Sequence, residues 1–230
     1  MKELLTQSLY FGFVLTFVAY EIGLFLKKKF KSALLTPLLV ASILIICVIL
    51  LLDIDYAVYY NGAKYISYFL TPATVSLAIP LYRQLSILKK YPVAIFGGIF
   101  AGVVTAMVSI WILSLGFDLT HEQYVTLLPK SITTAIGMGV SEKMGGIVSL
   151  TVVAISVTGI TGNIAAEAAL KLFRITNPIA KGLAIGTSAH ALGTSKAMEI
   201  GEIEGAMSSL AIVIAGIMTV VSVSFFANLL

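Results

Sequence analysis

Charge is scarce in this sequence. Only 11% of its 230 residues are charged and 59% are hydrophobic, whereas a soluble domain carries about 25% charged residues. With a mean hydropathy of +1.02, this scarcity excludes an ordinary soluble domain and predicts a polytopic membrane protein. The net charge of +4 does not indicate nucleic-acid binding, because the basic residues form short clusters between apolar runs. Such clusters orient a membrane protein and contact lipid headgroups.

Cysteine and histidine are nearly absent. The one cysteine, Cys47, lies in an apolar run, so we expect a buried structural thiol and no metal or redox site. Of the two histidines, we expect His121 to be solvated in an external loop. The sequence has no GxSxG, no HExxH and no cysteine pair. We therefore expect no catalytic residues, no metal, no cofactor and no enzyme activity.

Long apolar runs fill most of the chain and predict an all-α membrane protein with about six spanning helices, in a single domain covering residues 1–230. Pro72 and Pro80 are expected to kink and end the third span. Gly97, Gly98 and Gly102 give the fourth span a small-residue face for close helix packing. The expected spans are residues 8–26, 34–52, 63–81, 92–115, 147–170 and 206–229.

Three basic clusters set the expected topology. By the positive-inside rule they lie on the cytoplasmic side of the bilayer. Two polar segments, residues 127–146 and 179–204, must then each enter and leave on one side, the first from outside and the second from inside. We predict that both are re-entrant or broken-helix hairpins. The clusters are Lys27, Lys28, Lys29 and Lys31; Arg83, Lys89 and Lys90; and Lys171, Arg174 and Lys181.

The two polar segments resemble each other at an offset of 60 residues, which favours an inverted repeat. A shorter similarity relates residues 70–79 to residues 127–136. The identical pairs at offset 60 are Thr134 and Thr194, Met138 and Met198, Glu142 and Glu202, Gly145 and Gly205, Ser149 and Ser209, and Leu150 and Leu210.

Broken helices within a membrane leave free backbone N–H groups at half-helix N-termini, and these groups suit an anion such as a carboxylate. Hydroxyl, amide and cationic side chains complete such a site. An interfacial role for Lys130 and a packing role for His190 stay open as alternatives. The candidate substrate-binding residues are Lys130, Ser131, Thr133, Thr134, Asn163, His190, Gly193, Thr194 and Ser195.

Acidic residues within membrane segments can carry a coupling proton. Glu142, Glu199 and Glu202 are the candidates for that role. The alternative is that they lie at the membrane edge and pair with Lys143 and Lys196 or with helix ends, which is our interpretation of Glu204. We expect Glu167 to pair with the basic residues that follow it.

Two stretches carry a family resemblance. PKSITTAIGMGVSEKMGG (129–146) and HALGTSKAMEIGEIEGAMSSLA (190–211) resemble signatures of the LrgB/CidB family of integral membrane proteins, and TPATVSLAIPLY (71–82) fits as well. Ala191 stands where the family commonly has a glycine.

The resemblance implies a bacterial cytoplasmic membrane protein that acts with a small LrgA/CidA-like membrane partner and forms a homo-oligomer. It also implies two functions. One is a holin- or antiholin-like regulator of murein hydrolase activity and cell lysis. The other is a carrier for a small monocarboxylate such as pyruvate, glycolate or glycerate, because a related plastid translocator carries glycolate and glycerate. Opposed polar hairpins favour the carrier, with proton coupling left open, because a holin lesion needs only helices that pack and oligomerise.

Overall fold

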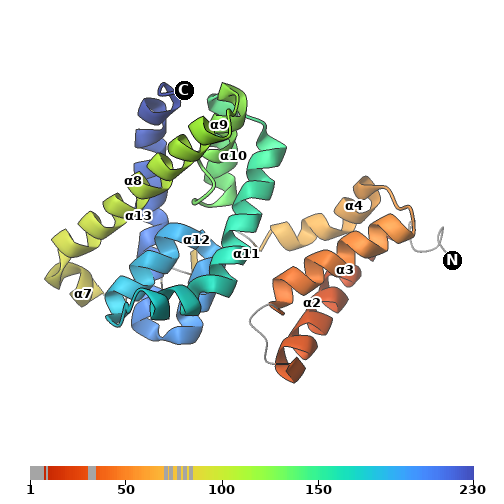
Figure 1. Cartoon of the computed structure of the whole chain (residues 1–230). Coiled ribbons are helices and arrows are strands. Elements are labelled where there is room, and N and C mark those ends of the chain that lie inside the picture. Colours follow the sequence, from red (N-terminus) through yellow and green to blue (C-terminus); the bar gives the residue numbers. More distant parts are fainter. Residues whose placement is uncertain are drawn as a thin grey trace. The chain divides into compact units, whose positions relative to one another are not determined.

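The computed structural model describes residues 8, 10–30, 35–69, 72, 75–76, 79, 82 and 85–230. Every element of regular structure in these ranges is an α-helix (Figure 1). The all-α class is therefore confirmed. The chain divides into two compact units, Met1–Ser76 and Leu77–Leu230.

The first unit contains three helices, α2 (Phe11–Phe30), α3 (Pro37–Leu51) and α4 (Tyr56–Ser67). Helix α2 packs against both α3 and α4. Gly12 lies directly against the backbone carbonyl of Tyr59, and Gly23 lies against Pro37. Glycine permits this approach because it has no β-carbon. The Thr16 hydroxyl lies 2.9 Å from the Tyr59 hydroxyl and links the same helix pair.

Two features of the first unit differ from expectation. The first apolar span was expected to end at residue 26, but helix α2 continues to Phe30, through Lys27 to Lys29, because cations are favourable in the last turn of a helix. Cys47 is exposed and not buried, because the residues that α3 buries are Val40 and Ala41 only. An exposed apolar face of this kind suits contact with lipid. Much of the expected third span, including Pro80, lies outside the described residues.

Three helices within the described ranges are long and apolar enough to cross a membrane: α8 (Pro92–Gly116), α11 (Val148–Leu172) and α13 (Glu202–Ala227). Helices of 25 or 26 residues extend about 38 Å, which exceeds the ~30 Å apolar thickness of a bilayer. Helix α3, at 15 residues, reaches only about 22 Å. The chain is thus a membrane protein with three clear candidate spans, and the count of six stays a prediction.

The first residues of α13 correct one expected boundary. The helix begins at Glu202, four residues before the expected span. Glu202 and Glu204 occupy its first turn, where carboxylates interact favourably with the partly positive helix N-terminus. Because these residues are charged, the hydropathy of the sequence assigned this turn to the preceding polar segment and not to the span.

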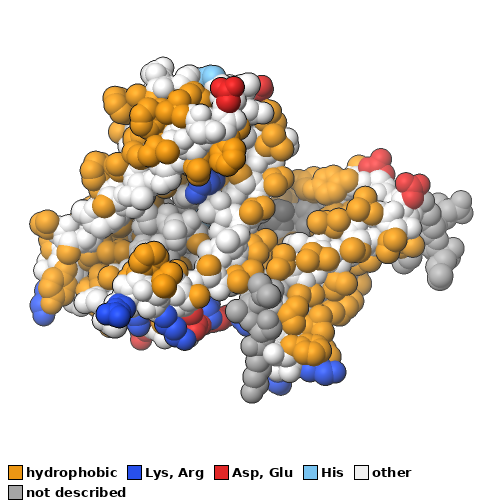
Figure 2. All heavy atoms as spheres, viewed as in Figure 1, with side chains coloured by type: hydrophobic (Ala, Val, Ile, Leu, Met, Phe, Trp, Pro, Cys, Tyr) orange, Lys and Arg blue, Asp and Glu red, His pale blue; other side chains and the backbone are white. Residues whose placement is uncertain are grey.

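The helices of the second unit cross it three times (Figure 1). Helix α8 follows α7 (Leu85–Lys90), and α9 (His121–Leu127) and α10 (Thr134–Lys143) connect the upper ends of α8 and α11. Helix α12 (Pro178–Ile200) connects α11 to α13 at the lower end. Lys and Arg side chains of this unit gather at that lower end in Figure 2, as expected if that end faces the cytoplasm.

Glycines bring the helices of the second unit into close contact. Gly182 and Gly186 of α12 lie directly against the backbone carbonyls of Glu204 and Ser208 in α13. A β-carbon built at Gly102 lies 2.5 Å from Thr187 Cγ2 of α12, and one built at Gly98 lies 3.6 Å from a Leu183 methyl. The expected packing face of α8 is confirmed at Gly98 and Gly102. Gly97 has no such neighbour within 4 Å.

Buried polar contacts fix the upper end of this unit. The Tyr124 hydroxyl donates to the Phe226 carbonyl at 2.8 Å, which ties α9 to the end of α13. Thr151 in α11 lies 2.7 Å from the Ser141 hydroxyl and 2.9 Å from the Thr126 carbonyl. Thr126, Ser141 and Thr151 are almost fully buried. Their hydrogen bonds therefore connect α9, α10 and α11 inside the unit.

The two halves of the sequence repeat differ in backbone structure. Between α10 and α11 the chain makes a turn at residues 144–147, with Gly145 at a φ of 78°. Between α12 and α13 only Gly201 separates the helices, and Gly205, the match of Gly145, lies inside α13. The matched residues therefore occupy unlike positions at these junctions.

Cysteine labelling will test the orientation of the second unit. In a Cys47→Ser background, we expect Lys90→Cys to react with a membrane-impermeant maleimide only in inside-out vesicles, and Glu122→Cys only in right-side-out vesicles. Lys90 ends α7 and Glu122 lies in the first turn of α9. The reverse labelling pattern would invert the proposed topology.

Candidate functional site

A partly buried lysine begins the candidate site. Lys130 lies in the short segment between α9 and α10, and its amine donates to the Ser131 hydroxyl at 3.3 Å. It makes no ion pair with any residue that the structure describes. Burial lowers the pKa of the Lys130 amine, because a buried cation loses hydration. A cation in this condition gains most from an anionic partner.

Lys130 and Ser131 line a cavity of about 600 Å³ between α8, their own segment and the first half of α12. This volume falls within the range of about 300–1,000 Å³ found for small-molecule sites. Its walls are mostly small side chains and hydroxyl groups. The other lining residues are Ala94, Gly98, Ala101, Gly102, Thr105, Ala106, Ser109, Ala180, Leu183, Ala184, Thr187 and Ser188.

Most hydroxyl groups in this cavity are already occupied as donors. Ser109, Thr187 and Ser188 each donate to the carbonyl four residues earlier in their own helix, at 2.6 to 2.7 Å. Such bonds are common for Ser and Thr in membrane helices. The donors that remain for an anion are therefore the Lys130 amine and the hydroxyls of Ser131 and Thr105.

The N-terminus of α10 lies close to these donors in the sequence. Thr133 is its N-cap residue, but its side chain makes no capping hydrogen bond. The first N–H groups of a helix have no partner within the helix and carry partial positive charge. Thr134 is the first residue of that turn.

Helix α12 is broken at His190, whose φ of 43° and ψ of −138° are not helical. The side chain is only 4% exposed, and its Nε2 lies 3.0 Å from the Ile155 carbonyl of α11. Thr194, one turn later, lies 3.0 Å from the His190 carbonyl and 2.7 Å from the Ser208 hydroxyl of α13. The broken turn is thus bonded to both neighbouring helices.

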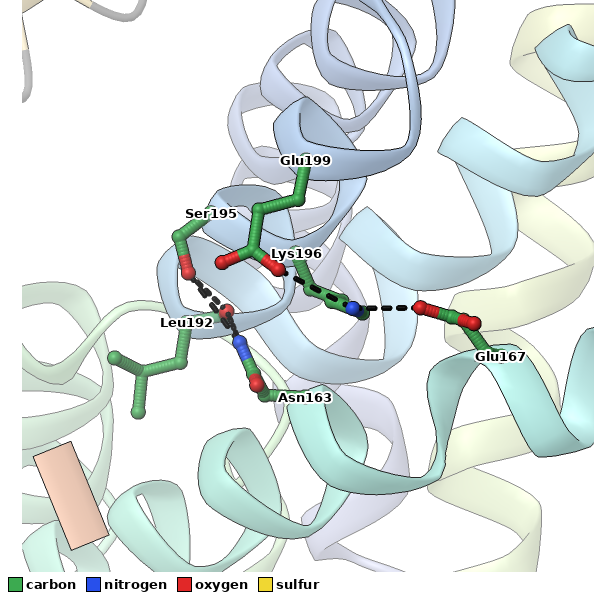
Figure 3. A network of polar contacts seen from close by, with 6 residues as sticks. All are labelled: Asn163, Glu167, Leu192, Ser195, Lys196 and Glu199. Atoms are coloured by element: carbon green, nitrogen blue, oxygen red, sulfur yellow. Dashed lines mark hydrogen bonds and ion pairs between the residues drawn. The ribbon is translucent and has the colours of Figure 1, made fainter. Parts of the chain in front are cut away.

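A second polar network joins α11 to the part of α12 after the break (Figure 3). The Asn163 amide donates to the Leu192 carbonyl at 2.8 Å and to the Ser195 hydroxyl at 3.3 Å. Ser195 also donates to the Leu192 carbonyl at 2.8 Å. These bonds satisfy a carbonyl close to the helix break.

Lys196 forms the ionic part of the same network (Figure 3). Its amine lies 2.6 Å from a Glu167 carboxylate oxygen and 3.2 Å from one of Glu199. Glu167 is thus paired, but with a lysine of α12 instead of the basic residues that follow it. Glu204 lies in the first turn of α13, as expected for pairing with a helix end, but its lysine partner is Lys181, at 3.8 Å.

The structure distributes the candidate substrate-binding residues over three places. Lys130 and Ser131 share the cavity with the first half of α12, and Thr133 and Thr134 begin α10. His190, Gly193 and Thr194 are buried at and after the break. Asn163 and Ser195 belong to the network of Figure 3. Of the proton-coupling candidates, Glu199 pairs with Lys196 in that network, and Glu142 and Glu202 are exposed. Their roles in binding and proton coupling stay predictions.

Sequence analysis missed four polar residues of the cavity. Thr105 and Ser109 lie four residues apart in α8, and Thr187 and Ser188 are adjacent in α12. The spacing of Thr105 and Ser109 places them on the same helix face as Gly98 and Gly102. These two hydroxyl residues on one face of an otherwise apolar span were the signal in the sequence that could have indicated the cavity.

Comparison with known proteins gives a consistent result. The family model of the LrgB-like family matches residues 16–229. The chain is 41% identical over 226 residues to the "Antiholin-like protein LrgB" of Bacillus subtilis (strain 168), covering 98% of each chain. It is 40% identical over 222 residues to the proteins of the same name in Bacillus mycoides (strain KBAB4) and Bacillus cereus (strain B4264), covering 96% of each chain. No solved structure matches this chain significantly.

The match extends across both compact units and includes the segment of Lys130 and the break at His190. The resemblance drawn from residues 129–146 and 190–211 is therefore confirmed, and the chain belongs to the LrgB-like family.

Proposed function

We propose that this chain is an antiholin-like protein of the bacterial cytoplasmic membrane, which restrains murein hydrolase activity together with a small LrgA/CidA-like partner. The observation behind this proposal is the 41% identity, over 98% of both chains, to the antiholin-like protein of Bacillus subtilis. The names of the relatives support this function better than they support a carrier.

A complementation experiment tests the antiholin-like role. In a Bacillus subtilis strain that lacks its own LrgB protein, we expect expression of this chain to return the rate of autolysis to the parental rate. Empty vector is the control, and membrane fractions establish that the protein is present. An unchanged autolysis rate despite normal membrane levels would contradict the proposal.

A second candidate activity is transport of a small monocarboxylate, and the cavity at Lys130 favours it. The partly buried Lys130 amine has no ion pair with a described residue. Next to it in the sequence are the Ser131 hydroxyl and a helix N-terminus without a side-chain capping bond. This combination complements a carboxylate. In this proposal the α9–α10 segment and α12 are the re-entrant elements of the carrier. An antiholin-like effect on lysis would then follow indirectly, from altered carboxylate flux and proton balance.

Reconstituted vesicles separate the two candidates. We expect vesicles with this chain and its small partner to take up labelled pyruvate saturably, with competition by glycolate and glycerate and without passage of sucrose. The matched control is vesicles with the partner alone. If pyruvate uptake is absent and unrelated solutes leak, the carrier is rejected and the lysis-regulating function remains.

A further inference from the structure

A second cavity lies at the lower end of the second unit, where α11 ends and α12 begins. It has a volume of about 710 Å³ and combines basic with apolar side chains. Three of the lining residues are cations, Lys171, Arg174 and Lys181. The other lining residues are Glu167, Leu170, Ile175, Thr176, Glu199 and Ile200.

The two carboxylates of this cavity share one lysine. Glu167 and Glu199 both pair with Lys196, as Figure 3 shows. Lys181 lies 3.8 Å from Glu204. Lys171 and Arg174 have no ion pair with any residue in the described ranges. Lys171 is attracted to Glu167 without a close contact. Two cations without a close ion pair to a described residue therefore line the cavity, and a phosphate group complements them.

The backbone of Arg174 adds an independent observation. Its φ is 53°, in the left-handed region, and the next residue closes the helix end through a bond from the Ile175 N–H to the Leu170 carbonyl at 2.9 Å. Glycine or asparagine is usual at this position, because a β-carbon is strained there. The geometry of the helix end therefore does not explain why an arginine occupies position 174.

An apolar cavity of about 350 Å³ adjoins the basic one, because Leu170 and Ile175 line both. Its walls are almost entirely small or apolar side chains of α11 and α12. Besides those two residues they are Gly162, Ala165, Ala166, Ala169, Phe173, Ala184, Ile185 and Ser188. A groove of small residues between two helices accommodates a hydrocarbon chain.

We propose that these joined cavities bind one anionic phospholipid, with its phosphate at Lys171 and Arg174 and one acyl chain in the groove between α11 and α12. Leu172 and Phe173, at 76% and 72% exposure, offer apolar side chains to lipid next to these basic residues. The expected topology puts it at the inner surface, where basic residues meet anionic headgroups. The basic cavity shares no lining residue with the Lys130 cavity, whereas Ala184 and Ser188 line both the groove and the Lys130 cavity. The lipid proposal does not rest on either proposed function.

Native mass spectrometry of the purified chain in detergent will measure the binding. We expect phosphatidylglycerol to bind roughly tenfold more tightly than phosphatidylcholine with the same acyl chains. The double variant Lys171→Gln with Arg174→Gly should lose roughly twenty-fivefold in phosphatidylglycerol affinity, since each basic residue near a lipid surface contributes about fivefold. Glycine at position 174 also relieves the strain of the left-handed backbone there. The melting temperature of the double variant should therefore not fall below that of the unmodified protein.

Two controls make the test specific. Lys89→Gln with Lys90→Gln removes the same charge from α7 at the same end of the unit and should leave the affinity unchanged. Ala169→Phe fills the groove and should weaken both lipids, whereas Ala168→Phe, on an exposed neighbouring position outside the groove, should weaken neither.

Three results would overturn the proposal. The first is equal affinity for the two lipids, and the second is normal phosphatidylglycerol binding by the double variant. The third is glycerol 3-phosphate competing as effectively as the whole lipid, which would assign the cavity to a free phosphate compound.

Discussion

Replacing Lys130 with methionine is expected to reduce pyruvate uptake by the reconstituted protein at least thirtyfold. Loss of one partner from a buried charge pair typically costs about 2–5 kcal/mol. Methionine keeps an unbranched apolar stem in the cavity, and it removes a cation that lacks an ion pair with the described residues. The fold should therefore be as stable as before, or more stable.

The matched control for this experiment is Lys143→Met. Lys143 is exposed in the last turn of α10 and does not line the cavity, so its loss should leave uptake unchanged. Initial rates of labelled pyruvate uptake, normalised to protein in the vesicles, give the comparison. Normal uptake by Lys130→Met would remove the lysine from the proposed carrier mechanism, and loss of uptake in both variants would make the effect nonspecific.

The second large effect is expected on stability, at Gly186. A β-carbon there would lie 2.8 Å from the Ser208 Cα and would overlap the Ser208 carbonyl oxygen. The obstacle is the backbone of a buried helix, so a rotamer change cannot relieve it. Gly186→Val should therefore destabilise the second unit by about 3 kcal/mol, which corresponds to roughly 6–12 °C in melting temperature.

Gly97→Val is the control for the stability experiment. Both glycines lie inside helices, so the difference in helix propensity is the same, but a β-carbon at Gly97 meets nothing within 4 Å. The remaining monodisperse fraction after heating, followed by size-exclusion chromatography in detergent, gives the melting temperatures. Equal melting temperatures for the two variants would show that α12 and α13 approach less closely than the structure has them.

Hydropathy predicted the spanning helices with the clearest boundaries. Residues 92–115 and 147–170 were expected, and α8 and α11 are Pro92–Gly116 and Val148–Leu172. A proline at N1 starts the first of these helices. Boundaries next to charged residues were harder to predict, because favourable charges at helix ends extend α2 and α13 beyond their apolar cores.

The candidate site was only partly predictable. Lys130 and Ser131 stand out because a lysine in an apolar chain needs an explanation. The partners from α12 could not be predicted, since residues 49 or more positions apart meet only through tertiary packing. The break at His190 was not predicted, because position 190 is neither glycine nor proline. The exposure of Cys47 was not predicted, because an apolar sequence does not show whether a side chain faces lipid or the protein interior.

The gathering of basic residues at one end of the second unit has a consequence for its behaviour under voltage. In the proposed orientation this end faces the electrically negative side of an energised bacterial membrane (Figure 2). Turning the unit over would carry those charges through the field, at about 2.3 kcal/mol per charge for each 100 mV. Vesicles without a membrane potential lack this constraint and will contain both orientations, so uptake should be compared between vesicle populations sorted by sidedness.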